Sequence, residues 1–162
     1  RQALLAGFAV IVLGALELNR PPHDGLEKEL AILQAVPDNS TALSNVGSQL
    51  IKRGRHEEAL KHLRKALELQ PGLDTARATL SDTLAVLANQ RSQSGRPDTA
   101  LLYLREAVEV EPDSAERHND LAVVLANAGR YDEAEFAFRE ALLLDPGHQT
   151  ARQNLQRLQQ VR

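Results

Sequence analysis

Two hydrophobic patterns divide the chain. Residues 3–16 are all apolar or glycine, so a helix over this segment has no polar face. From residue 26 onward, apolar residues instead recur at intervals of three and four among polar ones, which is typical of helices that bury one face. The pattern therefore predicts one helix that must be covered on all sides, followed by a series of amphipathic helices.

The apolar segment at residues 1–20 has three interpretations: a membrane segment or signal anchor, a buried core helix, or a cleaved signal peptide. A helix over its 14 apolar positions would be about 21 Å long. That is shorter than the roughly 30 Å hydrocarbon core of a bilayer, although Arg1 and Arg20 could extend its reach. We expect a membrane helix that contacts the bilayer through residues 3–18, and so a membrane-associated chain. Residues 21–25 then form a linker, because consecutive prolines end a helix.

Prolines mark a repeat in the rest of the chain. Pro37, Pro71, Pro112 and Pro146 are separated by 34, 41 and 34 residues. Between them, large and small apolar residues return at the same offsets. In the first unit these are Val46, Gly47, Leu50, Ala59, Leu63 and Ala66, and in the third they are Leu121, Ala122, Leu125, Ala134, Phe138 and Ala141. Each unit is predicted to be two helices joined by a turn.

This pattern of small and large apolar positions ending in proline resembles the tetratricopeptide repeat (TPR), a helix–turn–helix unit of about 34 residues. The resemblance implies an all-α fold, a TPR α-solenoid coiled into a right-handed superhelix, here with an N-terminal hydrophobic helix. The predicted units are residues 40–73, residues 74–114 with a seven-residue insertion, and residues 115–148. Residues 26–37 are predicted to form a half-repeat helix, and residues 149–162 a C-terminal capping helix, because stacked repeats need covered ends.

The middle unit leaves one alternative open. Two additional helical turns would keep Leu80, Leu84 and Leu87 on one face, because a heptad rotates a straight helix by only about 20°. Alternatively, the first helix has ordinary length and the polar residues 89–94 form a loop. We favour the longer helix.

Helix ends are marked in every unit. A glycine followed by arginine suits the end of each first helix, at Gly54, Gly95 and Gly129. Asn39 and Ser114 precede helical segments and are well placed to cap them.

Composition narrows the function. The chain has 19 Lys and Arg against 22 Asp and Glu, so it offers no cationic surplus for nucleic acid. It has no Cys, and therefore no thiolate metal site and no thiol nucleophile. His56 and His62 are six residues apart, rather than the four that place two imidazoles on one helical face. We expect no catalytic site, no metal, no cofactor and no enzymatic activity in this chain.

The TPR resemblance implies a binding surface on the concave side, where the first helix of each unit lines a groove for a peptide or a partner helix. The candidate groove residues are Thr41, Ser44, Asn45, Ser48, Lys52, Thr75, Ala78, Asp82, Glu116, Asn119, Asp120, Val123, Asn127 and Asn154. Alternatively, these are polar surface residues without a ligand.

Two specialised TPR grooves serve as comparisons. Chaperone-tail-binding members hold a terminal carboxylate with Lys, Arg and Asn, whereas the matching positions here include Ser44 and Glu116, so we do not expect that ligand. Asn45, Asp120 and Asn154 fall at the offset of the Asn ladder in O-GlcNAc transferase-like superhelices, although threonine interrupts the ladder in the second unit.

These features predict a non-enzymatic protein–protein interaction scaffold, tethered to a membrane, that binds another protein or a peptide. The alternative is a C-terminal TPR module of a membrane glycosyltransferase resembling protein O-mannosyltransferases, with its catalytic part upstream of Arg1. The chain contains no Met and starts at Arg1, so we expect a processed chain or a piece of a longer one. An open solenoid can also stack end to end, which makes self-association a further expectation.

Overall fold

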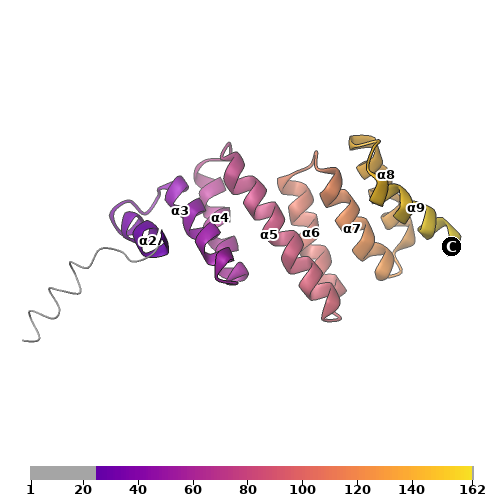
Figure 1. Ribbon diagram of the computed structural model, residues 1–162, viewed down its shortest axis with the longest axis horizontal. Coiled ribbons are helices and arrows are strands. Elements are labelled where there is room, and N and C mark those ends of the chain that lie inside the picture. The colour runs from indigo at the N-terminus through magenta and orange to yellow at the C-terminus, as the bar shows by residue number, and fades with distance from the viewer. Residues whose placement is uncertain (1–24, 162) are drawn as a thin grey trace, which may run out of the picture.

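The computed structural model describes residues 25–161, and this range forms eight α-helices and no strand (Figure 1). The helices are α2 (Gly25–Ala35), α3 (Ser40–Lys52), α4 (His56–Leu69), α5 (Asp74–Gln93), α6 (Pro97–Val110), α7 (Ala115–Asn127), α8 (Tyr131–Leu144) and α9 (Gln149–Gln160). The predicted all-α class is confirmed. The predicted hydrophobic helix at residues 1–20 lies outside the described residues.

The helices pack as antiparallel pairs stacked along one long axis (Figure 1). The pairs α3–α4, α5–α6 and α7–α8 make the most extensive contacts, while α2 and α9 cover the two ends. Helices α3, α5, α7 and α9 also contact one another in turn, whereas the backbones of α4, α6 and α8 stand further apart. The closely spaced row lies inside the curve of the stack. We call this row the concave side and the row of α4, α6 and α8 the convex side.

Glycine turns connect the two helices of each pair. Gly54, Gly95 and Gly129 have φ angles of 73°, 72° and 75°, a left-handed conformation that glycine adopts without steric cost. After α7, the N–H of Arg130 donates to the carbonyl of Leu125 at 2.9 Å, which satisfies a carbonyl at the end of the helix. The turn residues therefore set the antiparallel path of each pair.

Helix α5 contains the additional residues of the middle unit. It continues to Gln93, so residues 89–93 are helical, as favoured from the sequence, and α5 extends beyond its neighbours in Figure 1. Arg91 in the extension donates to Glu57 of α4 at 2.6 Å, and the hydroxyl of Tyr103 of α6 donates to the same carboxylate at 2.8 Å. Burial raises the pKa of Glu57, but the hydrogen bonds from Tyr103 and Arg91 outweigh it and hold the pKa below its ordinary value.

The core lies between the two rows of helices. Its largest fully buried side chains include Phe138, Leu60, Leu63, Leu84, Leu101 and Leu104. The core has two buried clusters, one around α3–α5 and one around α6–α9, and Tyr103 packs against both. Each unit thus depends on its neighbours for burial, as expected of a solenoid.

The two end helices bury less than the others. Helix α2 has no buried residue, but Leu26 and Leu33 pack partly against the core. Helix α9 buries Ala151 and Leu158. Val161 follows the last helical residue and is 69% exposed.

The predicted membrane association is contradicted by the described part of the chain. Residues 3–18, predicted to contact the bilayer, lie outside that part. Among helices α2 to α9, none combines the length and the hydrophobicity that crossing a bilayer requires. The longest, α5, has 20 residues but includes Asp74, Arg77, Asp82 and Arg91. We therefore do not retain a membrane location.

Candidate binding groove

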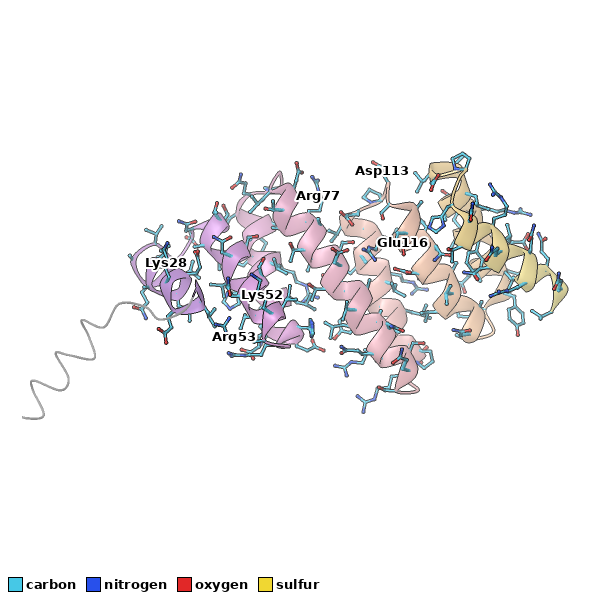
Figure 2. The ribbon with its side chains drawn as sticks, in the orientation of Figure 1. Lys28, Lys52, Arg53, Arg77, Asp113 and Glu116 are labelled. Carbon is cyan, nitrogen blue, oxygen red and sulfur yellow. The ribbon has the colours of Figure 1, made fainter. Side chains whose placement is uncertain are left out.

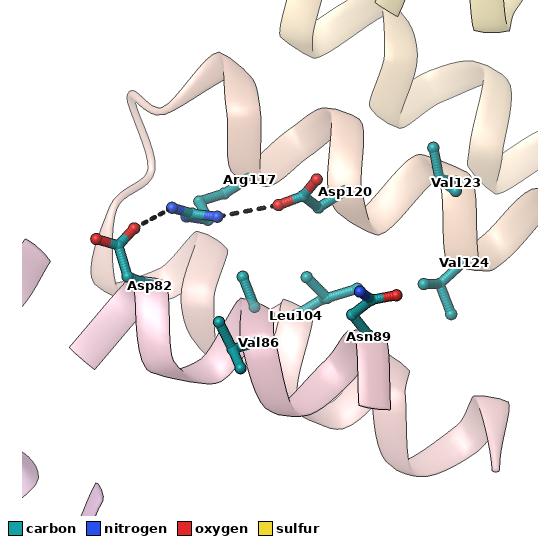
Figure 3. A pocket seen from close by; sticks show the side chains of 9 residues that line it. Asp82, Val86, Asn89, Leu104, Arg117, Asp120, Val123 and Val124 are labelled. Atoms are coloured by element: carbon teal, nitrogen blue, oxygen red, sulfur yellow. Dashed lines mark hydrogen bonds and ion pairs between the residues drawn. The ribbon is translucent and has the colours of Figure 1, made fainter. Parts of the chain in front are cut away.

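A pocket of about 490 Å³ lies on the concave side between α5 and α7 (Figure 3). Its lining residues are Asp82, Ala85, Val86, Asn89, Leu104, Arg117, Asp120, Val123 and Val124. On α5, Val86 and Asn89 follow Asp82 by four and seven residues, so the three share one helical face. On α7, Asp120 and Val123 face them. Leu104 of α6 is almost fully buried and forms part of the floor.

One end of the pocket is charged. Arg117 donates hydrogen bonds to Ser81 at 2.9 Å, to Asp120 at 3.0 Å and to Asp82, so it joins α5 to α7 (Figure 3). The carboxylate of Glu111 lies 3.9 Å from the Nε atom of the same arginine. The Arg117 side chain is only 12% exposed, so its guanidinium is fixed among these partners. Arg117 faces three carboxylates, and two of them, Asp82 and Asp120, line the pocket with it, so this end of the pocket carries one more negative than positive group.

Asp120 is partly buried among these charges. Burial raises the pKa of Asp120, and the nearby carboxylate of Glu116 raises it further, while Arg117 and His148 act in the opposite direction. The net result is a pKa above the ordinary value. A cation that entered the pocket would favour the ionised form, so the site is electrostatically suited to a positive group.

The other part of the pocket is apolar. Val86, Val123 and Val124 lie beyond the charged end, with Leu104 behind them (Figure 3). Val86 is 45% exposed, so its methyl groups are available to a ligand. Asn89, at the far end of the α5 wall, brings an amide that can donate and accept hydrogen bonds.

A second hollow of about 190 Å³ continues the groove toward α3. It is lined by Ile51, His56, Thr79, Asp82, Thr83 and Val86. Asp82 and Val86 line both hollows, so the two join across α5. The concave side therefore presents one groove that crosses α3, α5 and α7.

The predicted groove residues fall into three groups. Asp82, Asp120 and Val123 line the larger pocket, and Asp82 also lines the smaller one. Six further side chains are exposed and lie outside both hollows: Thr41, Lys52, Thr75, Ala78, Glu116 and Asn127, of which Lys52 and Glu116 are labelled in Figure 2. The remaining side chains are buried or hydrogen-bonded within the protein.

This third group has five members. Ser44 and Asn119 are 6% and 5% exposed. Ser48 donates to the backbone carbonyl of Ser44 at 3.1 Å, and Asn154 donates to Asn119 at 3.3 Å. Asn45 is exposed, but its amide donates to Glu29 of α2 at 3.1 Å. The proposed Asn ladder therefore has two of its amides engaged inside the chain.

Sequence reasoning did not find Val86, Asn89 or Arg117. The first two continue the face of Asp82 along the lengthened helix, so their spacing was an available signal. Arg117 precedes a buried segment of α7 and had no comparable signal, because its partners come from other helices. Within residues 25–161, no group of His, Asp and Glu side chains is arranged to hold a metal ion.

Stacked antiparallel helix pairs with a groove on the inner row define the class of helical-hairpin solenoids. Two family models described as "Tetratricopeptide repeat" match residues 38–113 and 92–159 and together span most of the chain. The chain belongs to the tetratricopeptide-repeat family. A search of curated protein sequences gave no match.

Solved structures support the fold. A crystal structure of MamA aligns with a TM-score of 0.58 and 20% identity, over 83% of this chain and 75% of MamA. A structure titled "MamA RS-1 ArsTM double mutant" aligns with a TM-score of 0.59 and 20% identity, over 82% of this chain and 71% of that one. The first TPR of Spaghetti (RPAP3), bound to an HSP90 peptide, aligns with a TM-score of 0.52 and 16% identity, over 75% of this chain and 91% of that one. None of these matches is a glycosyltransferase, so the predicted glycosyltransferase module has no support from them.

Proposed function

We propose that this chain is a protein-interaction module that binds an extended peptide segment in the groove between α5 and α7. The segment would place an aliphatic side chain against the valines and a lysine or arginine beside the carboxylates. The observation that carries this proposal is the pocket itself, which combines an apolar part with an end where Arg117 meets the two lining carboxylates of Asp82 and Asp120.

The apolar part favours a branched aliphatic side chain. Val86, Val123, Val124 and Leu104 offer contact on several sides. Burying one valine or leucine side chain contributes about 1.5–3 kcal/mol before the costs of association. By itself that contribution is smaller than the roughly 4.1 kcal/mol of a millimolar complex, so binding also requires the charged end of the pocket and contacts to the rest of the peptide.

The charged end favours a basic residue in the peptide, next to the aliphatic one. Asp82 is exposed and points away from the core, while Asp120 is only partly accessible. A lysine or arginine at this end would bring a cation to carboxylates that Arg117 alone does not neutralise. A terminal carboxylate would meet like charge, which agrees with the expectation that a chaperone-tail ligand does not suit this groove.

RPAP3 supports the proposal at the level of the fold, because its first TPR holds an HSP90 peptide on a similar stack of helices. The chemistry of the ligand proposed for this chain rests on its own side chains.

Fluorescence anisotropy with labelled peptides tests the proposal. One peptide set carries Val or Leu followed by Lys or Arg, and a matched set carries Glu in place of the basic residues. We expect the basic set to bind the full chain with a dissociation constant of tens to hundreds of micromolar, on the order of −5 to −6 kcal/mol. Binding should weaken as salt is raised, because the charged end is partly exposed.

Val86→Glu is the variant that removes the apolar contact. Val36→Glu is its control, because Val36 is 52% exposed against 45% for Val86 and does not line either hollow. We expect Val86→Glu to lose the aliphatic contact and Val36→Glu to bind like the wild type. Equal binding of acidic and basic peptides, or full binding by Val86→Glu, would show that this groove is not the site.

A further inference from the structure

The outward face of α8 carries an exposed apolar pair that the groove does not use. Phe136 is 66% exposed and Leu143 is 74% exposed, although both side chains are large and hydrophobic. They lie seven residues apart, two turns along the helix, with Arg139 and Glu140 between them on the same face. The buried residues of α8 are Ala134, Ala137, Phe138 and Ala141, on the opposite face. We call Phe136, Arg139, Glu140 and Leu143 the α8 stripe.

The other two convex helices do not repeat this pattern. The equivalent positions are Leu102, Arg105, Glu106 and Glu109 in α6, and Lys61, Arg64, Lys65 and Glu68 in α4. Arg64 and Glu106 form an ion pair at 2.6 Å, so part of these faces is used within the chain. Among the three helices, α8 alone has two apolar residues at these positions.

The α8 stripe is complementary to itself. A two-fold axis between Arg139 and Glu140 would pair two copies of α8 in antiparallel orientation. Phe136 of one copy then lies beside Leu143 of the other, and Arg139 lies beside Glu140, each contact occurring twice. From this geometry we propose that the α8 stripe binds a second copy of this chain.

The same operation is unfavourable for the neighbouring helices. In α6 it would place Leu102 beside Glu109, which buries an apolar side chain against a carboxylate. In α4 it would place Arg64 beside Lys65, which brings two cations together. The complementary arrangement of apolar and charged residues on α8 therefore selects this helix, rather than the convex side in general.

The dimer is small. Helix α8 has 14 residues and is about 21 Å long, so contact along one face covers less than the roughly 1,600 Å² of a standard interface. Arg139 keeps its ion pair with Glu135 at 2.6 Å in the free chain, so its charge is already compensated before association. We therefore expect a reversible dimer that forms at high micromolar concentration.

Sedimentation velocity of the full chain, from about 5 to about 500 µM, tests the proposal across the range expected for a small interface. We expect the average mass to rise from monomer toward dimer. Phe136→Glu should keep the chain monomeric over the whole series. Leu102→Glu is the matched control, because Leu102 is 65% exposed at the equivalent position of α6 and should associate like the wild type.

Charge reversal provides a second, independent test. Arg139→Glu alone and Glu140→Arg alone place like charges opposite each other across the two-fold axis, and each should weaken association at least several-fold. The double variant R139E/E140R restores opposite charges and should recover the dimer. Circular dichroism checks that all variants keep the helical content of the wild type.

Several outcomes would overturn the proposal. If the wild-type chain stays monomeric at every concentration, the α8 stripe does not bind a second copy and instead binds another protein or no partner. Association that persists in Phe136→Glu would place the contact elsewhere, for example at the ends of the solenoid. If Phe136→Glu and Leu102→Glu weaken association equally, the contact is not specific to α8. If the double variant R139E/E140R does not recover association, the proposed two-fold pairing of α8 is refuted.

Discussion

Replacing Gly47 with alanine tests how closely α3 and α4 approach each other. A Cβ atom at Gly47 would lie 2.7 Å from the Cγ atom of Leu63 and 2.9 Å from its Cδ2 atom, closer than carbon atoms can pack. Leu63 is completely buried, so its side chain is surrounded by other parts of the core. The substitution therefore requires α3 and α4 to move apart, or Leu63 to adopt a strained rotamer.

Two effects of opposite sign determine the result. Alanine is favoured over glycine inside a helix by about 1 kcal/mol. Overpacking a buried position costs about 1–3 kcal/mol. Because both close contacts involve a fully buried side chain, we expect the upper part of that range and a net loss of about 1–2 kcal/mol. The measurement is a urea titration followed by circular dichroism.

Two further variants isolate the steric cause. Gly72→Ala is the control, since no atom lies within 4 Å of the added Cβ, and its effect should stay within about 0.5 kcal/mol. Leu63→Ala costs about 2–5 kcal/mol by itself, but it removes the clashing atoms. Gly47→Ala in the Leu63→Ala background should therefore stabilise the chain. If Gly47→Ala is neutral or stabilising in the otherwise wild-type chain, the close packing of α3 against α4 is refuted.

Three further predictions concern a turn, a cap and a partly buried histidine. Gly129→Ala forces alanine to a φ of 75° and should cost about 1–2 kcal/mol in urea unfolding, whereas an unchanged midpoint would contradict the left-handed turn. Asn39→Ala removes the acceptor for the Ala42 N–H at 2.9 Å and should cost about 1 kcal/mol, with Asn39→Asp recovering most of it. Burial lowers the pKa of His62 below its ordinary value of 6.5, so the unfolded chain binds the proton more strongly. The contribution of His62 to stability is full above pH 6.5 and is lost as the pH falls toward its folded-state pKa; melting curves of His62→Gln should lack this part of the pH dependence.

The fold follows from features that the sequence shows directly. The spacing of Pro37, Pro71, Pro112 and Pro146 predicts the repeat, and the glycine after each first helix predicts the turn. The longer helix α5 was also predictable, because a heptad insertion leaves Leu87 on the buried face. Each of these signals can be recognised in the sequence itself, without knowing which residues pack against each other across the core.

The groove was harder to predict because one residue of error rotates a side chain by about 100° around a helix. Asp120 lines the pocket, whereas the adjacent Asn119 is buried and hydrogen-bonded to Asn154. The repeat pattern fixes which positions hold the core. It predicts less accurately which way each groove side chain points around its helix, since groove residues do not have to be apolar.

The net charge of the chain also gave no indication of the charged end of the pocket. Many of its charges cancel within a single turn, as in Arg55–Glu58, Lys65–Glu68 and Arg130–Glu133, and such exposed pairs contribute little to stability or recognition. At the pocket, Asp82 comes from α5 and meets Arg117 of α7 across the concave side. Since these residues are 35 apart in the chain, no count of lysines and glutamates could place them together. The excess of carboxylates that would select a basic ligand is a property of the stacked helices, and a near-neutral composition is compatible with it.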